Sequence, residues 1–307
     1  MLAGPWHRRR RRRHEHGHDR GLGSAYERYV FYQWVDRWAT TYGVTSALEG
    51  PHDGMAGVPG VHGVGLARRG IPVVSAVSSE PQAEVTRAVY ARADAPVTVR
   101  VIRDAEDTEL APADLVIVYH SLSLVPDWRT YLRSRAKLAR KLLVVTVCNP
   151  DNWGVSAMRL LARARGMRGF EPPESWHTET LAPLLWELGR IREHVYFDCP
   201  WWPDLPGISA GQSLKDRLTK LVGKNMQFTP DALANTELAT KFVYGAERWP
   251  YFGGDGWTTE LLPALLRHPS FEGVSPALAR RSGHLHAFVV DTSPRSPQAK
   301  RRLTKER

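Results

Sequence analysis

Short apolar runs alternate with amphipathic stretches over residues 44–147, and this alternation dominates the first half of the chain. The apolar runs are continuous, and glycine, proline or polar residues bound them. Such runs indicate strands that are buried on both faces, as in a parallel sheet between two layers of helices. The expected strands are 44–48, 72–77, 97–102, 114–119 and 141–147, and the expected helices are 64–69, 81–92 and 128–139.

The second half of the chain is less regular. The pattern predicts a helix over 178–188, a strand over 192–199 and a last strand over 284–291. We therefore expect an α/β core formed by 44–150 and 178–204 and completed by the last strand. Two insertions are expected to cap it on the substrate side and to determine the choice of substrate, at 154–177 and 205–283.

Aromatic residues at helical spacing over 26–38 predict a helix that precedes the first strand. Ser24 is its expected N-cap, with Glu27 three residues later as in a capping box. Most of these aromatic side chains are expected in the core. Tyr26 is a candidate substrate contact, because a leading helix can close over a ligand.

Composition indicates a single domain with appendages. The chain has 307 residues, of which 42% are hydrophobic, so it can bury a full core. No apolar run approaches the length of a membrane span, and the six arginines of 8–13 are not followed by the apolar region of an export signal. Cys148 and Cys199 form neither a disulfide framework nor a paired zinc motif. We expect a cytoplasmic protein without a metal site.

The net charge of +10 is confined to the ends of the chain. Residues 1–24 and 293–307 each carry a formal charge of +5, so the domain expected over 25–292 is neutral. Neither end interleaves aromatic residues with its charges, and we expect disordered, solubilising tails. Weak docking on a nucleic acid or another polyanion is the alternative.

The first expected strand runs into an acid and a glycine-rich turn, Leu48-Glu49-Gly50-Pro51-His52-Asp53-Gly54-Met55-Ala56-Gly57. In an open α/β sheet a nucleotide-type cofactor lies beyond the carboxyl ends of the strands, where glycines let the backbone approach it and a carboxylate can hold a ribose. This turn therefore predicts the start of a cofactor site.

Three further segments follow the glycine turn in a characteristic order: Arg103-Asp104-Ala105-Glu106-Asp107, the run 113–127 with its exit Tyr119-His120, and the run 141–150. Together they resemble the class I methyltransferases, the Rossmann-like family that uses S-adenosylmethionine. The resemblance covers about half of the chain. It implies a mostly parallel seven-stranded sheet with helices on both faces, in which the pair 192–199 and 284–291 supplies an antiparallel terminal strand.

The resemblance also implies a set of cofactor contacts. Glu49 or its neighbours would contact the methionine or ribose part, the backbone of Gly50, Gly54 and Gly57 would line the cofactor, and Asp104 with Ala105 would face the adenine. Two features depart from the family pattern. Pro51, Asp53 and Met55 occupy the usual glycine positions, and the second strand ends at Ser78 instead of an acid, which leaves Glu80 or Asp53 to hold the ribose hydroxyls.

Methyl transfer from a sulfonium depends mainly on positioning the acceptor and excluding water. A base is needed only if the acceptor loses a proton. His120, at the exit of the fourth strand, is the candidate base, although a histidine there can equally cap the next turn. Tyr119, Asn149 and Trp153 are candidate substrate contacts, together with Tyr26.

The sequence thus predicts a methyltransferase that acts on a small-molecule acceptor. The alternatives are a non-catalytic binding or scaffold protein of the same fold and an RNA-directed methyltransferase that uses the basic tails. A nicotinamide oxidoreductase is disfavoured, because the compact glycine fingerprint and the acid at the end of the second strand are poorly matched. No membrane span is expected, and the sequence does not indicate an oligomeric state.

Overall fold

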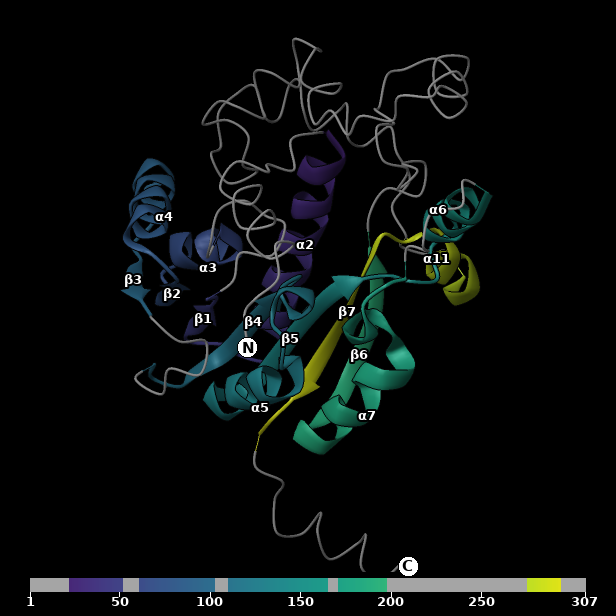
Figure 1. Cartoon of the computed structure of the whole chain (residues 1–307). Helices are drawn as coiled ribbons and strands as arrows, with labels where there is room; N and C mark the ends of the chain where they lie inside the picture. The colour runs from purple at the N-terminus through teal and green to yellow at the C-terminus, as the bar shows by residue number, and fades with distance from the viewer. Residues whose placement is uncertain (1–21, 52–60, 103–109, 165–170, 198–274, 294–307) are drawn as a thin grey trace, which may run out of the picture.

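The structure, a computed structural model, describes residues 22–51, 61–102, 110–164, 171–197 and 275–293. These residues form a seven-stranded sheet with the order β3-β2-β1-β4-β5-β7-β6 (Figure 1). Neighbouring strands are parallel from β3 to β5, and β7 runs antiparallel to both of its neighbours. The strands are β1 (Ala47–Glu49), β2 (Val73–Val77), β3 (Thr98–Val101), β4 (Ala113–Tyr119), β5 (Ala139–Cys148), β6 (Arg190–Phe197) and β7 (Leu285–Asp291).

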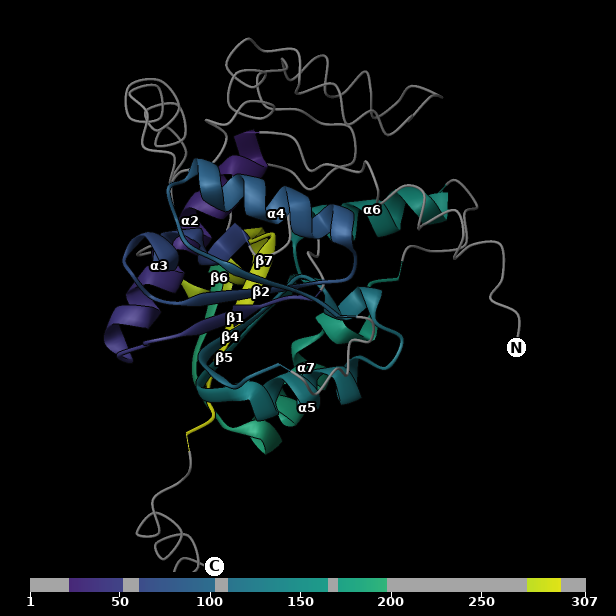
Figure 2. The same cartoon turned by 90° about the vertical axis from the view of Figure 1, so that its left-hand side faces the viewer.

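Helices cover both faces of the sheet, as Figure 2 shows with the sheet seen edge-on. One hydrophobic cluster joins the sheet to α2 (Leu22–Thr41), α3 (Val64–Arg68) and α4 (Glu80–Arg92), and includes Phe31, Val64 and Tyr90. The second cluster lies on the opposite face under α5 (Trp128–Leu138) and α7 (Thr178–Leu188), and includes Tyr131 and Leu181. The prediction of a Rossmann-like sheet between two helical layers, with an antiparallel terminal strand, is confirmed.

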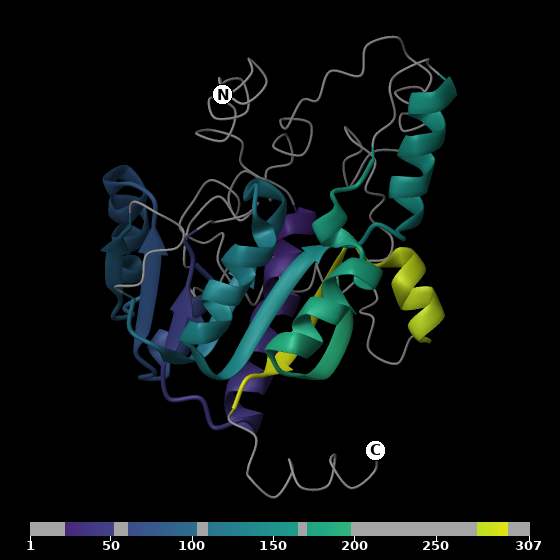
Figure 3. The same ribbon diagram turned by 60° about the horizontal axis from the view of Figure 1, so that its bottom comes forward.

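Two helices lie beside the sheet instead of on its faces. Figure 3 shows α6 (Trp153–Ala164) extending past the end of β5 and α11 (Pro276–Ser282) next to it, leading into β7. Short 3₁₀ turns, η1 (Val61–Gly63), η2 (Leu122–Leu124) and η3 (Glu174–Trp176), complete the described elements. Within the described residues, no helix is long and apolar enough to cross a bilayer.

The predicted strands and helices agree with the structure to within three residues at most ends, but one local prediction is wrong. Ser24 lies inside α2, which begins at Leu22, so it is not the N-cap. The expected insertion 154–177, predicted as a helical cap, contains the helix α6. Most of the expected insertion 205–283 lies outside the described residues, and its last part forms α11.

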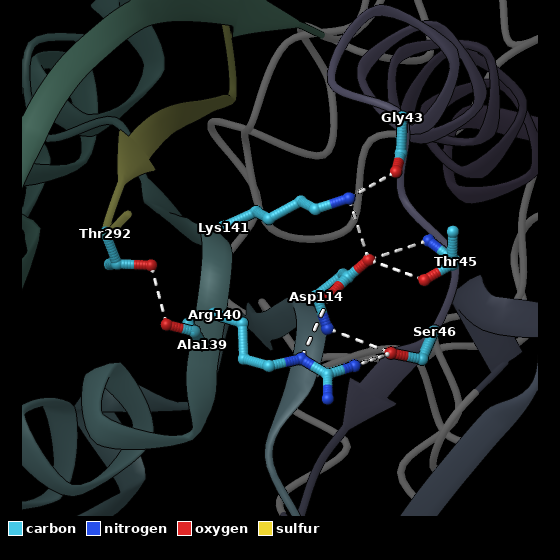
Figure 4. A network of polar contacts seen from close by, with 8 residues as sticks. All are labelled: Gly43, Thr45, Ser46, Asp114, Ala139, Arg140, Lys141 and Thr292. Carbon is cyan, nitrogen blue, oxygen red and sulfur yellow. Dashed lines mark hydrogen bonds and ion pairs between the residues drawn. The ribbon is translucent and has the colours of Figure 1, made fainter. Parts of the chain in front are cut away.

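A polar network joins the amino ends of β1, β4 and β5 (Figure 4). The buried carboxylate of Asp114 accepts hydrogen bonds from the backbone and hydroxyl of Thr45, at 3.0 and 2.7 Å. Arg140 and Lys141 each place a nitrogen 3.0 Å from the same carboxylate. Burial raises the pKa of Asp114, but the hydrogen bonds and charges of these partners lower it by more. The net pKa therefore lies well below the usual value of 3.8.

We expect Asp114→Asn to lower the free energy of unfolding by about 2 kcal/mol, because a buried, charge-assisted set of hydrogen bonds loses its negative charge and one of its two acceptor oxygens. The depressed native pKa means that the unfolded chain takes up the proton first, so this stabilisation is lost as the pH falls below about 4. Urea unfolding measures the change. Asp36→Asn is the control: it removes an exposed pair with Arg69 and is expected to cost less than about 0.5 kcal/mol. Equal effects of the two substitutions would contradict the role of Asp114.

Candidate functional site

The carboxyl ends of β1 and β4 form the switch point of the sheet. These two strands are neighbours, yet the chain leaves β1 toward the face covered by α3 and leaves β4 toward the face covered by α5. In open α/β sheets, ligands bind outside the carboxyl ends of the strands at such a point. The residues placed there are Glu49 and Tyr119, which end β1 and β4, and Gly50 and His120, which follow them.

Glu49 is buried, and groups of this chain occupy both of its oxygens. Oε1 lies 2.5 Å from Nδ1 of His62, and Oε2 accepts a hydrogen bond from the backbone nitrogen of Gly63 at 3.1 Å. The carboxylate of Glu49 thus lies at the start of the helical segment formed by η1 and α3, where backbone N–H groups point outward and favour a negative charge. Both oxygens of the predicted cofactor contact Glu49 therefore have partners within this chain.

Gly50 adopts a backbone conformation that favours glycine, with φ of +105°. Its backbone runs directly over β2, and its carbonyl accepts a hydrogen bond from the hydroxyl of Tyr131 at 3.3 Å. Burial raises the pKa of Tyr131 to about 12, so this hydroxyl keeps its proton and remains a donor. Asp53, Gly54 and Gly57 lie outside the described residues.

The two polar residues predicted at the end of β2 make hydrogen bonds or ion pairs to α4. The backbone nitrogen and hydroxyl of Ser78 both donate to Oε1 of Gln82, at 3.0 and 2.7 Å. Glu80 begins α4 and pairs with Arg87 at 2.7 Å on an exposed surface. Asp104 and Ala105, predicted to face the adenine, lie outside the described residues.

An aromatic cluster closes one side of the switch point. The Tyr119 ring is buried and lies 3.9 Å from the ring of His62, between centroids. Phe31, from α2, contacts both rings, at 4.9 and 5.0 Å. Tyr26 belongs to the same helix, but its side chain is outside the described part of the structure. The structure thus brings Tyr119 next to the pair formed by Glu49 and His62.

His120 lies on the other side of β4, against β5. Its φ of +52° is in the left-handed region, and its Nε2 lies 2.7 Å from Sγ of Cys148. Burial raises the pKa of the Cys148 thiol, but His120 and His284 lower it by more. The net pKa therefore lies below the usual value of 9.0. His120 is therefore a member of a buried thiol–imidazole pair.

We expect His120→Gln to move the appearance of the Cys148 thiolate to higher pH, because the thiolate loses the charge and the hydrogen bond that His120 contributes. The rate of iodoacetamide alkylation as a function of pH measures this. Mass spectrometry separates the Cys148 peptide from the Cys199 peptide, and Cys199 serves as the internal reference. An unchanged Cys148 profile would contradict the pairing.

Asn149 and Trp153, predicted as substrate contacts, differ in their exposure to solvent. Asn149 is buried, and its Nδ2 donates to the backbone carbonyls of Arg280 and Gly283, at 2.6 and 2.7 Å. Asn152 makes the same kind of bond to Gly283. These two amides fasten α11 to the end of β5. Trp153 begins α6 and is 41% exposed.

No family model matches the sequence, and no curated protein matches it. Among solved structures, the chain is similar to magnesium protoporphyrin IX methyltransferase from Synechocystis PCC 6803 with bound SAH, with 16% identity over 54% of this chain and 74% of that one and a TM-score of 0.43. It is also similar to the N-methyltransferase NodS from Bradyrhizobium japonicum WM9, with 17% identity over 62% and 90% and a TM-score of 0.37.

A candidate methyltransferase from Bacillus halodurans C-125 matches over more of the chain, 86% of this one and 99% of that one, with 12% identity and a TM-score of 0.44. The seven-stranded, mostly parallel sheet and its antiparallel strand β7 agree with what the resemblance to class I methyltransferases implied. The chain has the class I methyltransferase fold.

Within this methyltransferase fold, sequence reasoning missed two functional candidates, His62 and Cys148. The signal for His62 was its position just before Gly63, between a glycine-rich turn and a helix. For Cys148 the signal was its position at the end of an apolar strand, β5. This strand follows β4 in the chain, and His120 comes directly after β4. Neither signal identifies the partner, since Glu49 and His62 are thirteen residues apart and His120 and Cys148 are twenty-eight apart.

Proposed function

We propose that this protein is an S-adenosylmethionine-dependent methyltransferase that acts on a small-molecule acceptor. The observation that carries the proposal is the sheet order, in which β7 is inserted antiparallel between β5 and β6. A dinucleotide-binding dehydrogenase sheet has the order 3-2-1-4-5-6 with parallel strands. The reversed strand therefore favours the methyltransferase over the nicotinamide oxidoreductase.

The residues at the switch point fit an adenosyl donor with an amino-acid tail. Gly50 lets the chain turn at the end of β1 in close contact with the backbone of Ala76, and a buried ring nitrogen of His62 has no hydrogen-bond partner among the described residues. When bound, the donor would supply an activated methyl group on a positively charged sulfur. On this proposal Gly50, with Gly54 and Gly57, lines the donor with backbone.

The remaining donor contacts are proposed from the family pattern. Asp104 and Ala105 would face the adenine, and Asp53, Ser78 and Glu80 are the candidates for the ribose hydroxyls. For Ser78 and Glu80 this role requires exchanging their present partners, Gln82 and Arg87, for the ligand. Asp53, in the glycine turn, is the third candidate.

The acceptor would bind on the side of β4 and β5, where Tyr119 and His120 end one strand and Cys148 ends the next. His120 would accept a proton from an acceptor that must lose one. Its contact with Cys148 holds the imidazole in place through Nε2. Tyr26, Asn149 and Trp153 remain proposed contacts for the acceptor, and Asn149 would act by fastening α11 at the edge of this site.

A small acceptor is favoured because the segment 25–292 carries no net charge, whereas a large nucleic-acid footprint calls for a basic surface. Incubation with donor labelled in its methyl group tests this. We expect label in a metabolite fraction of low molecular mass and none in total RNA. Label in RNA that disappears on deletion of 1–24 and 293–307 would favour the RNA-directed alternative. Absence of transfer despite donor binding would favour the non-catalytic one.

A further inference from the structure

His62 carries a buried nitrogen that the described part of the protein does not use. Its side chain is 1% exposed, and Nδ1 contacts Glu49, yet Nε2 has no hydrogen-bond partner among the described residues. Leaving a buried polar atom unpaired costs free energy, and such atoms are rare in folded proteins. The nitrogen is therefore a candidate for contact with a ligand.

The partner of Nδ1 determines the chemistry of Nε2. The carboxylate of Glu49 accepts hydrogen bonds, so it favours a proton on Nδ1, and the neutral tautomer with that proton presents a lone pair at Nε2. The second oxygen of Glu49 accepts from the backbone of Gly63. Within the described residues, no lysine or arginine pairs with Glu49, so with the neutral tautomer of His62 the pair keeps the negative charge of the carboxylate.

The surroundings of His62 favour a positively charged ligand group. Tyr119, Phe31 and Tyr32 surround the imidazole, with ring centroids 3.9, 5.0 and 5.8 Å away. Aromatic faces attract cations, and an apolar environment strengthens the attraction between a buried carboxylate and a cation. A hydrogen-bond acceptor backed by a carboxylate and enclosed by aromatic rings matches an ammonium group.

We propose that Nε2 of His62 accepts a hydrogen bond from the α-ammonium group of the donor's amino-acid tail, and that Glu49 is the positioning residue that holds the imidazole in this tautomer. This inference rests on the proposed function. It assigns the recognition of the ammonium group to a side chain that follows the glycine turn, and it gives Glu49 an indirect role.

Calorimetric titration with four ligands tests the inference. The ligands are S-adenosylhomocysteine, its analogue without the amino group, its analogue without the carboxyl group, and 5′-methylthioadenosine, which lacks both. The wild type is expected to bind S-adenosylhomocysteine about tenfold to a hundredfold more tightly than the deamino analogue, the range for a hydrogen bond to a charged group.

Two substitutions separate the nitrogens of His62. His62→Asn places an amide N–H where Nδ1 donates to Glu49 and removes Nε2, so we expect it to abolish the preference for the amino group. His62→Gln places its amide near Nε2 and is expected to restore part of that preference. Binding of 5′-methylthioadenosine should be unchanged in both variants, which also shows that they fold.

The other outcomes are decisive. If the wild type binds neither S-adenosylhomocysteine nor 5′-methylthioadenosine, the proposed function is wrong. If it binds both and His62→Asn keeps the preference for the amino group, the proposed function stands and the role of His62 is wrong. A variant that instead loses the preference for the carboxyl group would show that Nε2 is a donor, and equal losses for all four ligands would show a structural role. Both results overturn the inference.

Discussion

Gly50→Ala is expected to lower the free energy of unfolding by at least about 4 kcal/mol, a large part of the stability of a typical domain. Two causes add. The φ of +105° is unfavourable for a residue with a Cβ atom, and a Cβ there would lie 2.1 Å from the carbonyl oxygen of Ala76 in β2. Backbone on both sides must move, so the end of β1 separates from β2. Urea unfolding of the purified variant measures the loss.

Gly70→Ala is the matched control for the backbone conformation alone. Gly70 has a φ of +79°, and nothing lies within 4 Å of a Cβ built on it. Its substitution is expected to cost about 1–2 kcal/mol, the usual penalty for a left-handed residue. Equal losses for the two substitutions would show that the contact between Gly50 and Ala76 does not restrict this turn.

Acidification is expected to destabilise the protein strongly between pH 6.5 and pH 5, through two histidines of the antiparallel strands. Nε2 of His194 lies 2.9 Å from Nδ1 of His286, and Nε2 of His286 lies 3.0 Å from the carbonyl oxygen of Trp176. Burial, with Arg280 as a smaller cause, lowers the pKa of His194 to about 4; burial, with His194 as a smaller cause, lowers that of His286 to about 3.

The sign follows from the depressed native pKa values. Below pH 6.5 the unfolded chain takes up two protons that the native chain does not, so stability falls by up to about 2.7 kcal/mol per pH unit. Carboxylates remain largely ionised over this range, which isolates the histidines. Denaturant unfolding at several pH values measures the slope. His286→Gln should reduce it by about half, and an unchanged slope in this variant would contradict the assignment.

The sheet could be predicted from the sequence because its strands are buried on both faces. The runs that became β2, β4 and β5 are continuous apolar segments between clear boundaries, so composition alone identifies them. The end of α2 toward the N-terminus was not predicted correctly, because Ser24 has the residue type of a cap and helical residues precede it. Local propensity marks a helix more reliably than it marks the first residue.

The candidate site was predicted only in outline. Glu49, Gly50, Tyr119 and His120 were identified because each ends a strand, and parallel strands end at one edge of the sheet. The partners of these residues depend on side-chain packing between distant segments, which no periodicity reports. The sequence therefore placed Glu49 at a ligand, whereas the fold places His62 on its carboxylate, and it proposed His120 as a base without indicating its contact with Cys148.

The central claim is that the carboxyl ends of β1 and β4 bind an adenosyl donor. A crystal structure of the protein with S-adenosylhomocysteine tests it most directly. We predict the ligand at the switch point, with its chain along the backbone of Gly50 and its amino-acid end at Nε2 of His62. A switch point filled by the protein's own side chains, with no room for an adenosine, would contradict the account.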